Sequence, residues 1–360
     1  MTTSSTLSAW LLAGRVTSQQ AATATEEARR AEEIGFRRVF LSERYNIKEA
    51  GAVLGGVGAS TSTIGFGTGV LACRSRHPLM MAALGATLHA AYGPRFTLGI
   101  GRSEASWVPG QLPVSFDEIV DYVSIMKRLW AGETVTYDGP AGRFEGLALG
   151  DTYDGPAPEV WLGMLGLKRA TDTGANPAFD GVMLSPMITP EATQRAVEAL
   201  RKNCERHDRD PASLRILVPV VTAPDLDEKE TRELCHARFV TYVTWPNGHV
   251  YEPLNGWDRG IMEDIRNHAV VRQAEAMGTT ADYAFHREEL GGPASLVPDE
   301  WMAASCAIGS VDECVAKLRE YMAAGVDEIA VYGSTVQQNA KLAERWIAET
   351  ERAPVGASSS

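Results

Sequence analysis

Two glutamates, Glu43 and Glu104, lie close to arginines in segments that directly follow apolar runs. A carboxylate can hold or transfer a proton, whereas a guanidinium keeps its proton in proteins and can only bind or polarise a group. A glutamate beside an arginine also forms structural ion pairs, and such pairs make poor acids. Glu43, Arg44 and Glu104 are therefore the catalytic candidates, with an ion pair as the competing interpretation for Glu43.

Glycines mark the ends of two other apolar runs. Gly101 comes just before Arg102 and Ser103, and the segment Gly163–Gly166 comes just before Lys168 and Arg169. A backbone without Cβ atoms can approach a ligand closely and can direct consecutive N–H groups at an anion. The sequence predicts a phosphate near the start of the helix after residue 163, and ordinary turns are the competing interpretation.

Several other chemistries lack their sequence signals. The five cysteines include no C-x-x-C pair, and no pair of histidines has metal-ligand spacing, so no metal site is predicted. The chain has neither a G-x-S-x-G elbow nor a GxxxxGK[ST] loop, and Gly99-Ile100-Gly101 lacks the third glycine of a dinucleotide-binding turn. The net charge of −12 argues against nucleic acid or an anionic membrane as the main partner.

The candidate residues require elements that bring their segments together. Short apolar runs rich in β-branched residues alternate with amphipathic stretches, which is typical of βα units and a parallel sheet. The eight runs are 7–14, 38–42, 63–71, 95–101, 159–163, 179–184, 214–220 and 327–332. This pattern predicts a (β/α)8 TIM barrel, in which the carboxyl ends of the strands carry the site, with a doubly wound sheet as the alternative.

The domain organisation follows from the interruptions of this repeat. We expect one barrel domain over residues 7–350, with insertions at about 132–158 and 222–307, and flexible ends at 1–6 and 351–360. Ser115-x-x-Glu118 and Ser310-x-x-Glu313 predict capped helix starts. No segment has the length of a spanning helix or the pattern of a signal peptide, so a cytoplasmic protein is expected.

Four segments together resemble the luciferase-like monooxygenase superfamily, and most closely its deazaflavin branch, the coenzyme F420-dependent oxidoreductases. They read GFRRVFLSERYNI, IGFGTGVLACRSRHPLMMAALGATLHAAYGPRFTLGIGRSE, VWLGMLGLKRA and GSVDECVAKLREYMAAGVDEIAVYG. The resemblance covers most of residues 7–345, is strongest over 34–104 and is weakest over 222–300. It implies a bacterial-luciferase-like barrel with the flavin or deazaflavin across its carboxyl end.

The resemblance also implies roles for particular residues. A bulge containing a non-prolyl cis peptide, which backs the middle of the cofactor ring, corresponds to Gly69-Val70. The phosphate loops correspond to Gly101-Arg102-Ser103 and to Met164-Leu165-Gly166, with Gly163 in the family's glycine pair. Ser42 is included among the cofactor-binding residues, and Glu104 matches a glutamate near the ring.

One departure from the family's pattern affects the reaction. Relatives that oxidise sugar phosphates carry Asp-His after the second strand, and this chain has Glu43-Arg44. The histidine that takes the alcohol proton is therefore missing, which favours a reductase or an oxidation with another base. The leading hypothesis is a hydride transfer between coenzyme F420 and a small organic substrate.

Two alternatives remain, an FMN-dependent monooxygenase of the same superfamily and a flavin-binding relative without catalysis. A homodimer is expected, because residues 50–56 and 80–84 form small apolar helix faces suited to packing between subunits.

Overall fold

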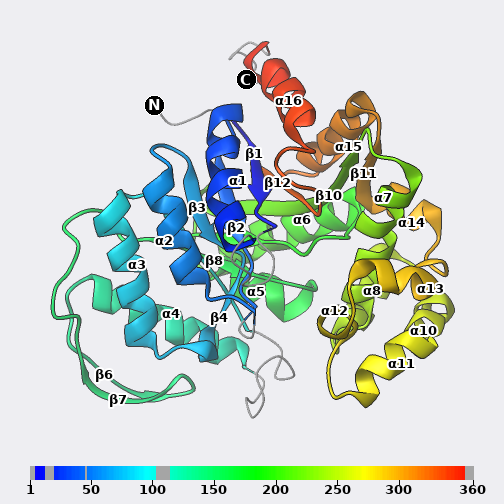
Figure 1. Cartoon of the computed structure of the whole chain (residues 1–360). Helices are drawn as coiled ribbons and strands as arrows, with labels where there is room; N and C mark the ends of the chain where they lie inside the picture. The colour runs from blue at the N-terminus through cyan, green and yellow to red at the C-terminus, as the bar shows by residue number, and fades with distance from the viewer. Residues whose placement is uncertain (1–4, 13–19, 45–46, 103–113, 353–360) are drawn as a thin grey trace.

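A computed structural model describes residues 5–12, 20–44, 47–102 and 114–352. Eight parallel strands close into a barrel, because β9 pairs with β10 and so joins the two ends of the sheet. The chain thus forms the predicted (β/α)8 barrel, and the doubly wound alternative is wrong (Figure 1). The terminal residues 1–4 and 353–360, part of the predicted flexible ends, lie outside the described residues.

The eight barrel strands overlap in residue number with the eight apolar runs of the sequence. In barrel order they are β1 (Leu7–Trp10), β2 (Arg38–Leu41), β3 (Gly65–Thr68), β5 (Phe96–Gly101), β8 (Glu159–Gly163), β9 (Gly181–Met183), β10 (Arg215–Pro224) and β12 (Glu328–Tyr332). Strands such as β2 and β5 are buried along their whole length, because helices cover one face and the barrel interior covers the other.

A helix packs outside the barrel after each strand. These helices are α1 (Gln20–Ile34), α2 (Ala50–Ser60), α3 (Pro78–Tyr92), α4 (Phe116–Trp130), α5 (Lys168–Ala175), α6 (Pro190–Arg206), α15 (Val311–Ala323) and α16 (Ala340–Arg352). In α4 the buried residues Ile119, Val123 and Met126 recur at helical spacing, which directs one apolar stripe at the strands.

Large side chains from six strands fill the barrel interior. The cluster comprises Trp10, Phe40, Trp161, Met183, Leu217 and Ala330. The barrel is therefore a packed core, and a ligand must bind at one of its ends.

A polar network occupies the amino end of the barrel. Glu328, which is fully buried, accepts a hydrogen bond from Ser8 Oγ at 2.5 Å and lies 3.2 Å from Arg38 Nε. Arg38 also donates to Thr97 Oγ1 at 2.8 Å. Charges buried here are paired, which indicates a structural role for this end and leaves the carboxyl end for chemistry.

Two helix starts show how local sequence sets the elements around the barrel. Ser310 Oγ accepts from the N–H of Glu313, whose carboxylate accepts from the N–H of Ser310, so the predicted capping box at α15 is confirmed. Ser115 caps α4 through Glu118 N, but the Glu118 carboxylate binds Arg74 instead. The Glu118 carboxylate therefore forms an ion pair with the segment after β3 and does not complete a capping box at α4.

Several elements lie outside the barrel repeat. β4 (Leu71–Ala72) and the 3₁₀ turn η1 (Cys73–Ser75) follow β3, β6 (Val135–Gly139) and β7 (Gly142–Leu147) form an antiparallel hairpin, and η2 (Pro211–Ser213) precedes β10.

Residues 225–305, which we call the helical insertion, contain short helices and 3₁₀ turns. These are α7 (Glu228–Leu234), α8 (His236–Val243), η3 (Gly248–Val250), α9 (Tyr251–Asn255), α10 (Arg259–Asn267), α11 (Ala269–Ala276), α12 (Ala281–Ala284), η4 (Arg287–Leu290), α13 (Gly291–Ala294) and α14 (Asp299–Ser305).

Strand β10 connects the helical insertion to the barrel. Its first residues pair with β9, its middle residues with β12, and Val221–Pro224 with an added parallel strand, β11 (Cys306–Gly309). The N–H of Asp225 donates to the carbonyl of Gly309 at 2.8 Å, so the residue that follows β10 is bonded to the last residue of β11. The helical insertion lies to the right in Figure 1, and α2 and α3 lie to the left.

Candidate active site

The bulge after β3 is fixed at the carboxyl end of the barrel by two side chains. Ser42 Oγ donates to the carbonyl of Gly69 at 2.8 Å and accepts from Trp10 Nε1 at 2.9 Å. The peptide bond between Gly69 and Val70 is cis, as the resemblance implies. A Cβ atom on Gly69 would lie 2.1 Å from the Trp10 ring, so only glycine fits here. The ends of β1, β2 and β3 thus form one connected unit.

The loop after β8 lies against the same bulge. A Cβ atom on Gly163 would lie 2.7 Å from Val70 Cγ1, which places these two predicted cofactor residues next to each other. The N–H of Met164 donates to the carbonyl of Met183 at 2.9 Å and is therefore already used. Gly166 has a φ of +93°, and Leu165 is half-buried beside it. These two residues lead the chain directly into α5.

Glu43 is engaged in a two-point ion pair with Arg76. Arg76 Nη1 donates to Glu43 Oε2 at 2.9 Å and Nη2 donates to Oε1 at 2.5 Å, and the Glu43 side chain is 3% exposed. Arg76 also binds Glu49, whose side chain is half-exposed. The hydrogen bond to Glu43 raises the pKa of Arg76 above the usual value of a guanidinium. The geometry matches the ion pair that the sequence offered as the competing interpretation for Glu43.

Arg44 reaches across to the helical insertion. Its Nη2 donates to the backbone carbonyl and to Oδ2 of Asp282, at 3.0 and 3.2 Å. Its guanidinium also lies over the Tyr283 ring, 4.2 Å from the centroid. Arg44 therefore joins the loop after β2 to α12, and Ser42, Glu43 and Arg44 point to three different partners.

Arg102 lies at the end of β5, against the start of α4. Its Nε donates to the carbonyl of Val114 at 2.6 Å, and its guanidinium lies over the Phe116 ring at 4.0 Å. Gly101 is the last residue of β5, and the other two predicted residues of this loop, Ser103 and Glu104, lie outside the described residues.

Arg74 and Arg76 both lie in the segment that follows β3. Because these two guanidiniums form ion pairs with Glu118 and with Glu43 and Glu49, most of the positive charge after β3 is neutralised within the protein.

Lys48 is a titratable group that the sequence reasoning missed. Burial, followed by the nearby charge of Arg44, lowers its pKa to about 8, and Glu27 opposes the change. Glu27 in turn accepts from the N–H of Leu12 at 3.1 Å, just beyond β1, and burial raises its pKa. A lysine six positions after the end of an apolar run carries no periodic signal, so only the folded chain shows its burial near Arg44.

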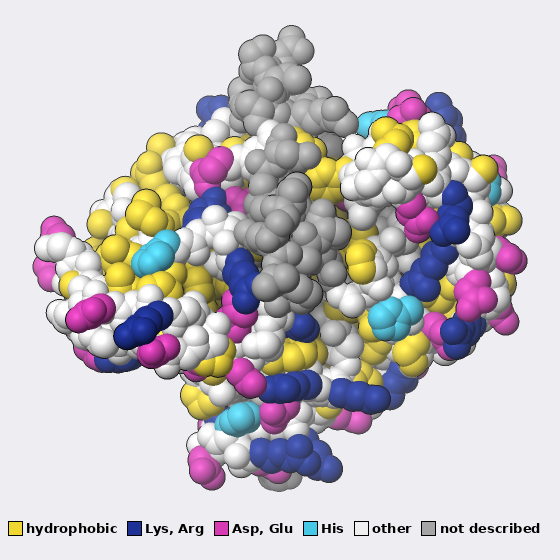
Figure 2. All heavy atoms as spheres, turned by 90° about the horizontal axis from the view of Figure 1, so that it is seen from below, with side chains coloured by type: hydrophobic (Ala, Val, Ile, Leu, Met, Phe, Trp, Pro, Cys, Tyr) yellow, Lys and Arg dark blue, Asp and Glu magenta, His cyan; other side chains and the backbone are white. Residues whose placement is uncertain are grey.

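Figure 2 views the molecule from below Figure 1, which is the side of the carboxyl ends of the strands. Hydrophobic side chains gather on the left of this view, on the side that carries α2 and α3. Among the residues described, no group of three or more His, Cys, Asp or Glu side chains is placed to hold a metal ion. No helix in the described part of the chain is long and apolar enough to cross a membrane.

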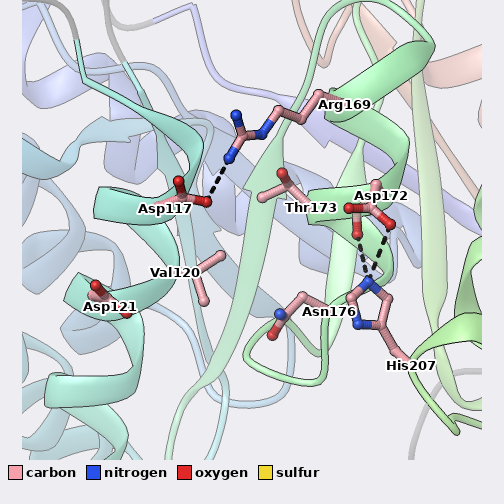
Figure 3. A pocket seen from close by; sticks show the side chains of 8 residues that line it. All are labelled: Asp117, Val120, Asp121, Arg169, Asp172, Thr173, Asn176 and His207. Atoms are coloured by element: carbon pink, nitrogen blue, oxygen red, sulfur yellow. Dashed lines mark hydrogen bonds and ion pairs between the residues drawn. The ribbon is translucent and has the colours of Figure 1, made fainter. Parts of the chain in front are cut away.

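A separate cavity of about 250 Å3 lies on the outside of the barrel, between α4 and α5 (Figure 3). Four of its side chains form two pairs: Arg169 contacts Asp117 at 2.5 Å, and His207 Nε2 lies 3.3 Å from Asp172 Oδ1. A third carboxylate, Asp121, accepts a hydrogen bond from Tyr137 at 2.6 Å. Because these groups already bind other side chains of the protein, this cavity is not part of the candidate site.

Comparison with known proteins identifies the family. Residues 1–328 match the luciferase-like monooxygenase family, and the chain belongs to it. The chain is 24% identical over 325 residues to the 5,10-methylenetetrahydromethanopterin reductase of Methanolobus tindarius, which covers 89% of this chain and 92% of that protein. It is 30% identical over 217 residues to the F420-dependent glucose-6-phosphate dehydrogenase of Microbacterium testaceum, covering 55% of this chain and 63% of that protein.

Solved structures show the same fold. The coenzyme F420-dependent tetrahydromethanopterin reductase of Methanopyrus kandleri superposes with a TM-score of 0.78 at 20% identity, covering 96% of this chain and 99% of that one. An F420-dependent secondary alcohol dehydrogenase superposes with a TM-score of 0.69 at 16% identity, covering 97% and 99%. The predicted family and fold are confirmed, and the chain is an oxidoreductase of this family.

Proposed function

We propose that this protein transfers a hydride between coenzyme F420 and a small organic substrate that is still to be identified. The observation that carries the proposal is the connected unit of Trp10, Ser42 and Gly69, which presents the bulge at the carboxyl end of the barrel. Relatives that match over most of this chain, or over half of it, include enzymes named as F420-dependent. A bound deazaflavin supplies a two-electron hydride donor or acceptor at its C5 atom.

The residues at the mouth fit such a ring. The side chains of the interior cluster fill the barrel below, so a planar ligand would lie across the strand ends rather than enter the barrel. Gly69 and Val70 would back the middle of the ring, with Ser42 holding the bulge in place. At Gly69 the bulge consists of backbone atoms alone, because a Cβ atom here would collide with the Trp10 ring.

The phosphate would lie between the loops after β5 and β8. In this proposal Gly101, Arg102 and Ser103 would bind it from one side, and Gly163, Met164, Leu165 and Gly166 from the other. Arg102 is held by its contacts with Val114 and Phe116, so its charge is already positioned at this side of the mouth. A positioned guanidinium favours an oxyanion more than a mobile one does, because less side-chain entropy is lost on binding.

Catalytic roles are proposed for three residues: Glu43 and Glu104 for proton handling or ring positioning, and Arg44 as an anion or carbonyl contact. Arg44 can only bind or polarise, since its guanidinium keeps its proton. Glu43 holds Arg76 through both carboxylate oxygens, so its main effect would be to fix that arginine beside the site. The protein is proposed to act in the cytoplasm, as a homodimer formed through α2 and α3.

Two other functions compete with this proposal, and titration with F420 and with FMN tests them as well. The family also includes enzymes that use FMN, such as a 3,6-diketocamphane monooxygenase solved in complex with FMN, which has 16% identity to this chain. A non-catalytic flavin-binding protein is the third candidate.

The decisive experiment is a titration of the purified protein with coenzyme F420 and, separately, with FMN, followed by fluorescence or calorimetry. We expect saturable binding of F420 and much weaker binding of FMN. Tight binding of FMN alone would overturn the proposal in favour of the monooxygenase. Reduced F420 that is never reoxidised by any substrate in a panel of ketones, enones and imines would favour the non-catalytic alternative.

A further inference from the structure

Two arginines of the helical insertion lie at the end of β12. Arg238 belongs to α8, and its guanidinium lies over the Tyr332 ring, 4.6 Å from the centroid. Arg287 begins η4, and the Arg238 charge is the second largest influence on its pKa. Tyr332 is the last residue of β12 and packs edge-on against Trp10, with 5.6 Å between the ring centroids. Arg238 is thus linked through the Tyr332 and Trp10 rings to the unit that holds the bulge, and Arg287 lies within the electrostatic influence of Arg238.

Neither arginine has a carboxylate partner among the residues that the structure describes. Arg238 Nη2 donates to the carbonyl of Gly333 at 3.5 Å, while its Nε is buried without a hydrogen-bond partner. Arg287 Nη1 is likewise buried without a partner. The buried Arg38 and the half-buried Arg74 and Arg76 differ, because each forms an ion pair with a glutamate.

This arrangement is unfavourable in the protein without a ligand. Burial, followed by the neighbouring Arg238 charge, lowers the pKa of Arg287 to about 10, and Glu233 and Glu288 compensate only in part. Two half-buried cations that lie close together lose part of their hydration and repel each other. A bound anion would reduce this repulsion and would accept hydrogen bonds from the guanidinium N–H groups. Guanidinium groups bind carboxylates and phosphates through charge-assisted, often two-point, hydrogen bonds.

The arginine pair lies on the far side of the mouth from the proposed phosphate loops. In barrel order β12 and β5 are four strands apart in both directions, so they are diametrically opposed. The loops after β5 and β8 carry Arg102 and the glycines, whereas β12 carries Tyr332 and the arginine pair. An anion bound by Arg238 and Arg287 would therefore belong to a different molecule, or a different end, from the one held by Arg102.

We propose that Arg238 and Arg287 bind an oxyanion of the substrate, a carboxylate or a phosphate group, at the rim of the barrel opposite the cofactor phosphate. This inference rests on the proposed function, since it assigns the substrate side of the same site. It defines the substrate as an anion whose reacting carbon lies between the arginine pair and the bulge. The helical insertion, which supplies both arginines, would then select the substrate by charge.

The test measures melting temperature and calorimetric binding with inorganic phosphate and with malonate, against sodium chloride at equal ionic strength. Three variants are compared with the wild type: Arg238→Met, Arg287→Met and, as the matched control, Arg272→Met. Arg272 lies in α11, has a mostly exposed side chain and pairs with Glu275. Methionine keeps much of the apolar stem and removes the charge.

We expect phosphate or malonate to raise the melting temperature of the wild type and of Arg272→Met. Arg238→Met and Arg287→Met should weaken anion binding about tenfold or more, as the loss of one charged hydrogen bond predicts. Arg287→Met should also melt no lower than the wild type in chloride, because it removes a half-buried charge that Glu233 and Glu288 compensate only in part. Anion affinity that is equal in all four proteins, or absent from the wild type, would overturn the proposal.

A second arm repeats the titrations with saturating F420. Undiminished anion binding is expected, since the cofactor phosphate is assigned to the opposite rim. If F420 abolishes anion binding, the arginine pair holds the cofactor's own anionic tail and the substrate assignment is wrong. Failure of F420 to bind at all would overturn the proposed function, and the anion titrations without F420 would still report on the arginine pair.

Discussion

Gly69 is the residue on which the shape of the candidate site depends most directly. We expect Gly69→Ala to weaken F420 binding about tenfold or more, because its Cβ atom would need the space of the Trp10 ring and would displace the bulge. The matched control is Gly55→Ala in α2, where an added Cβ atom meets nothing within 4 Å. Fluorescence titration compares the two variants, and equal affinity would remove the bulge from the site.

Lys48 gives the site a predicted pH dependence of stability. Its pKa is about 8 in the folded protein and 10.5 in an ordinary lysine, so between these values the unfolded chain binds more protons. The free energy of unfolding therefore rises with pH across this interval. Below pH 8 Lys48 is charged in both states, and its destabilising effect on the folded protein is complete. Lys48→Met should stabilise the protein at pH 7 by on the order of 1 kcal/mol, after allowance for solvent screening.

Urea unfolding at pH 7 and at pH 10.5 measures this effect, and the gain from Lys48→Met should vanish at the higher pH. Lys229→Met is the control, because the Lys229 side chain is 84% exposed. A gain that is the same at both pH values would show that packing, and not charge, causes it.

Among the elements, α12 and the loop after β2 depend on each other through Arg44. Asp282→Ala removes one of the two oxygens that Arg44 binds, so we expect amide hydrogen exchange to become about fivefold faster in α12 and near residue 44. The barrel strands should be unaffected. Asp258→Ala, which removes the cap of α10, is the control, and its effect should stay within that helix. Unchanged exchange in α12 would mean that Arg44 contributes nothing to its placement.

The elements also show how far sequence reasoning reaches. The eight barrel strands follow from β-branched apolar runs, because a strand buried on both faces has a strong local signature. The partners of Glu43 and Arg44 could not be predicted in this way. Arg76 lies 33 positions from Glu43 and Asp282 lies 238 positions from Arg44, so only the folded barrel brings them together. Arg238 and Arg287 carry no sequence motif, and their lack of counterions is visible only in three dimensions.

At the scale of the whole molecule, α2 and α3 predict self-association. Met80 in α3 is 61% exposed and lies on the side where Figure 2 shows hydrophobic side chains gathering. We expect light scattering to give a particle of about 78 kDa, twice the chain mass of 38.9 kDa, and Met80→Lys to shift it toward the monomer. Met277→Lys is the control, because Met277 is 60% exposed but lies just after α11. A wild-type particle of about 39 kDa at micromolar concentration would contradict the dimer.

The hydrogen bond between Asp225 and Gly309 has a consequence for how this protein could diversify. Because this bond ties the residue after β10 to the end of the neighbouring strand β11, residues 225–305 lie between two strands that are fixed to each other and can be exchanged as one segment. A segment of another length or sequence could be inserted between the same two strands without shifting the register of any barrel strand. New arginines, or none, could thus be brought to the rim by recombination, while the bulge that faces them is inherited unchanged.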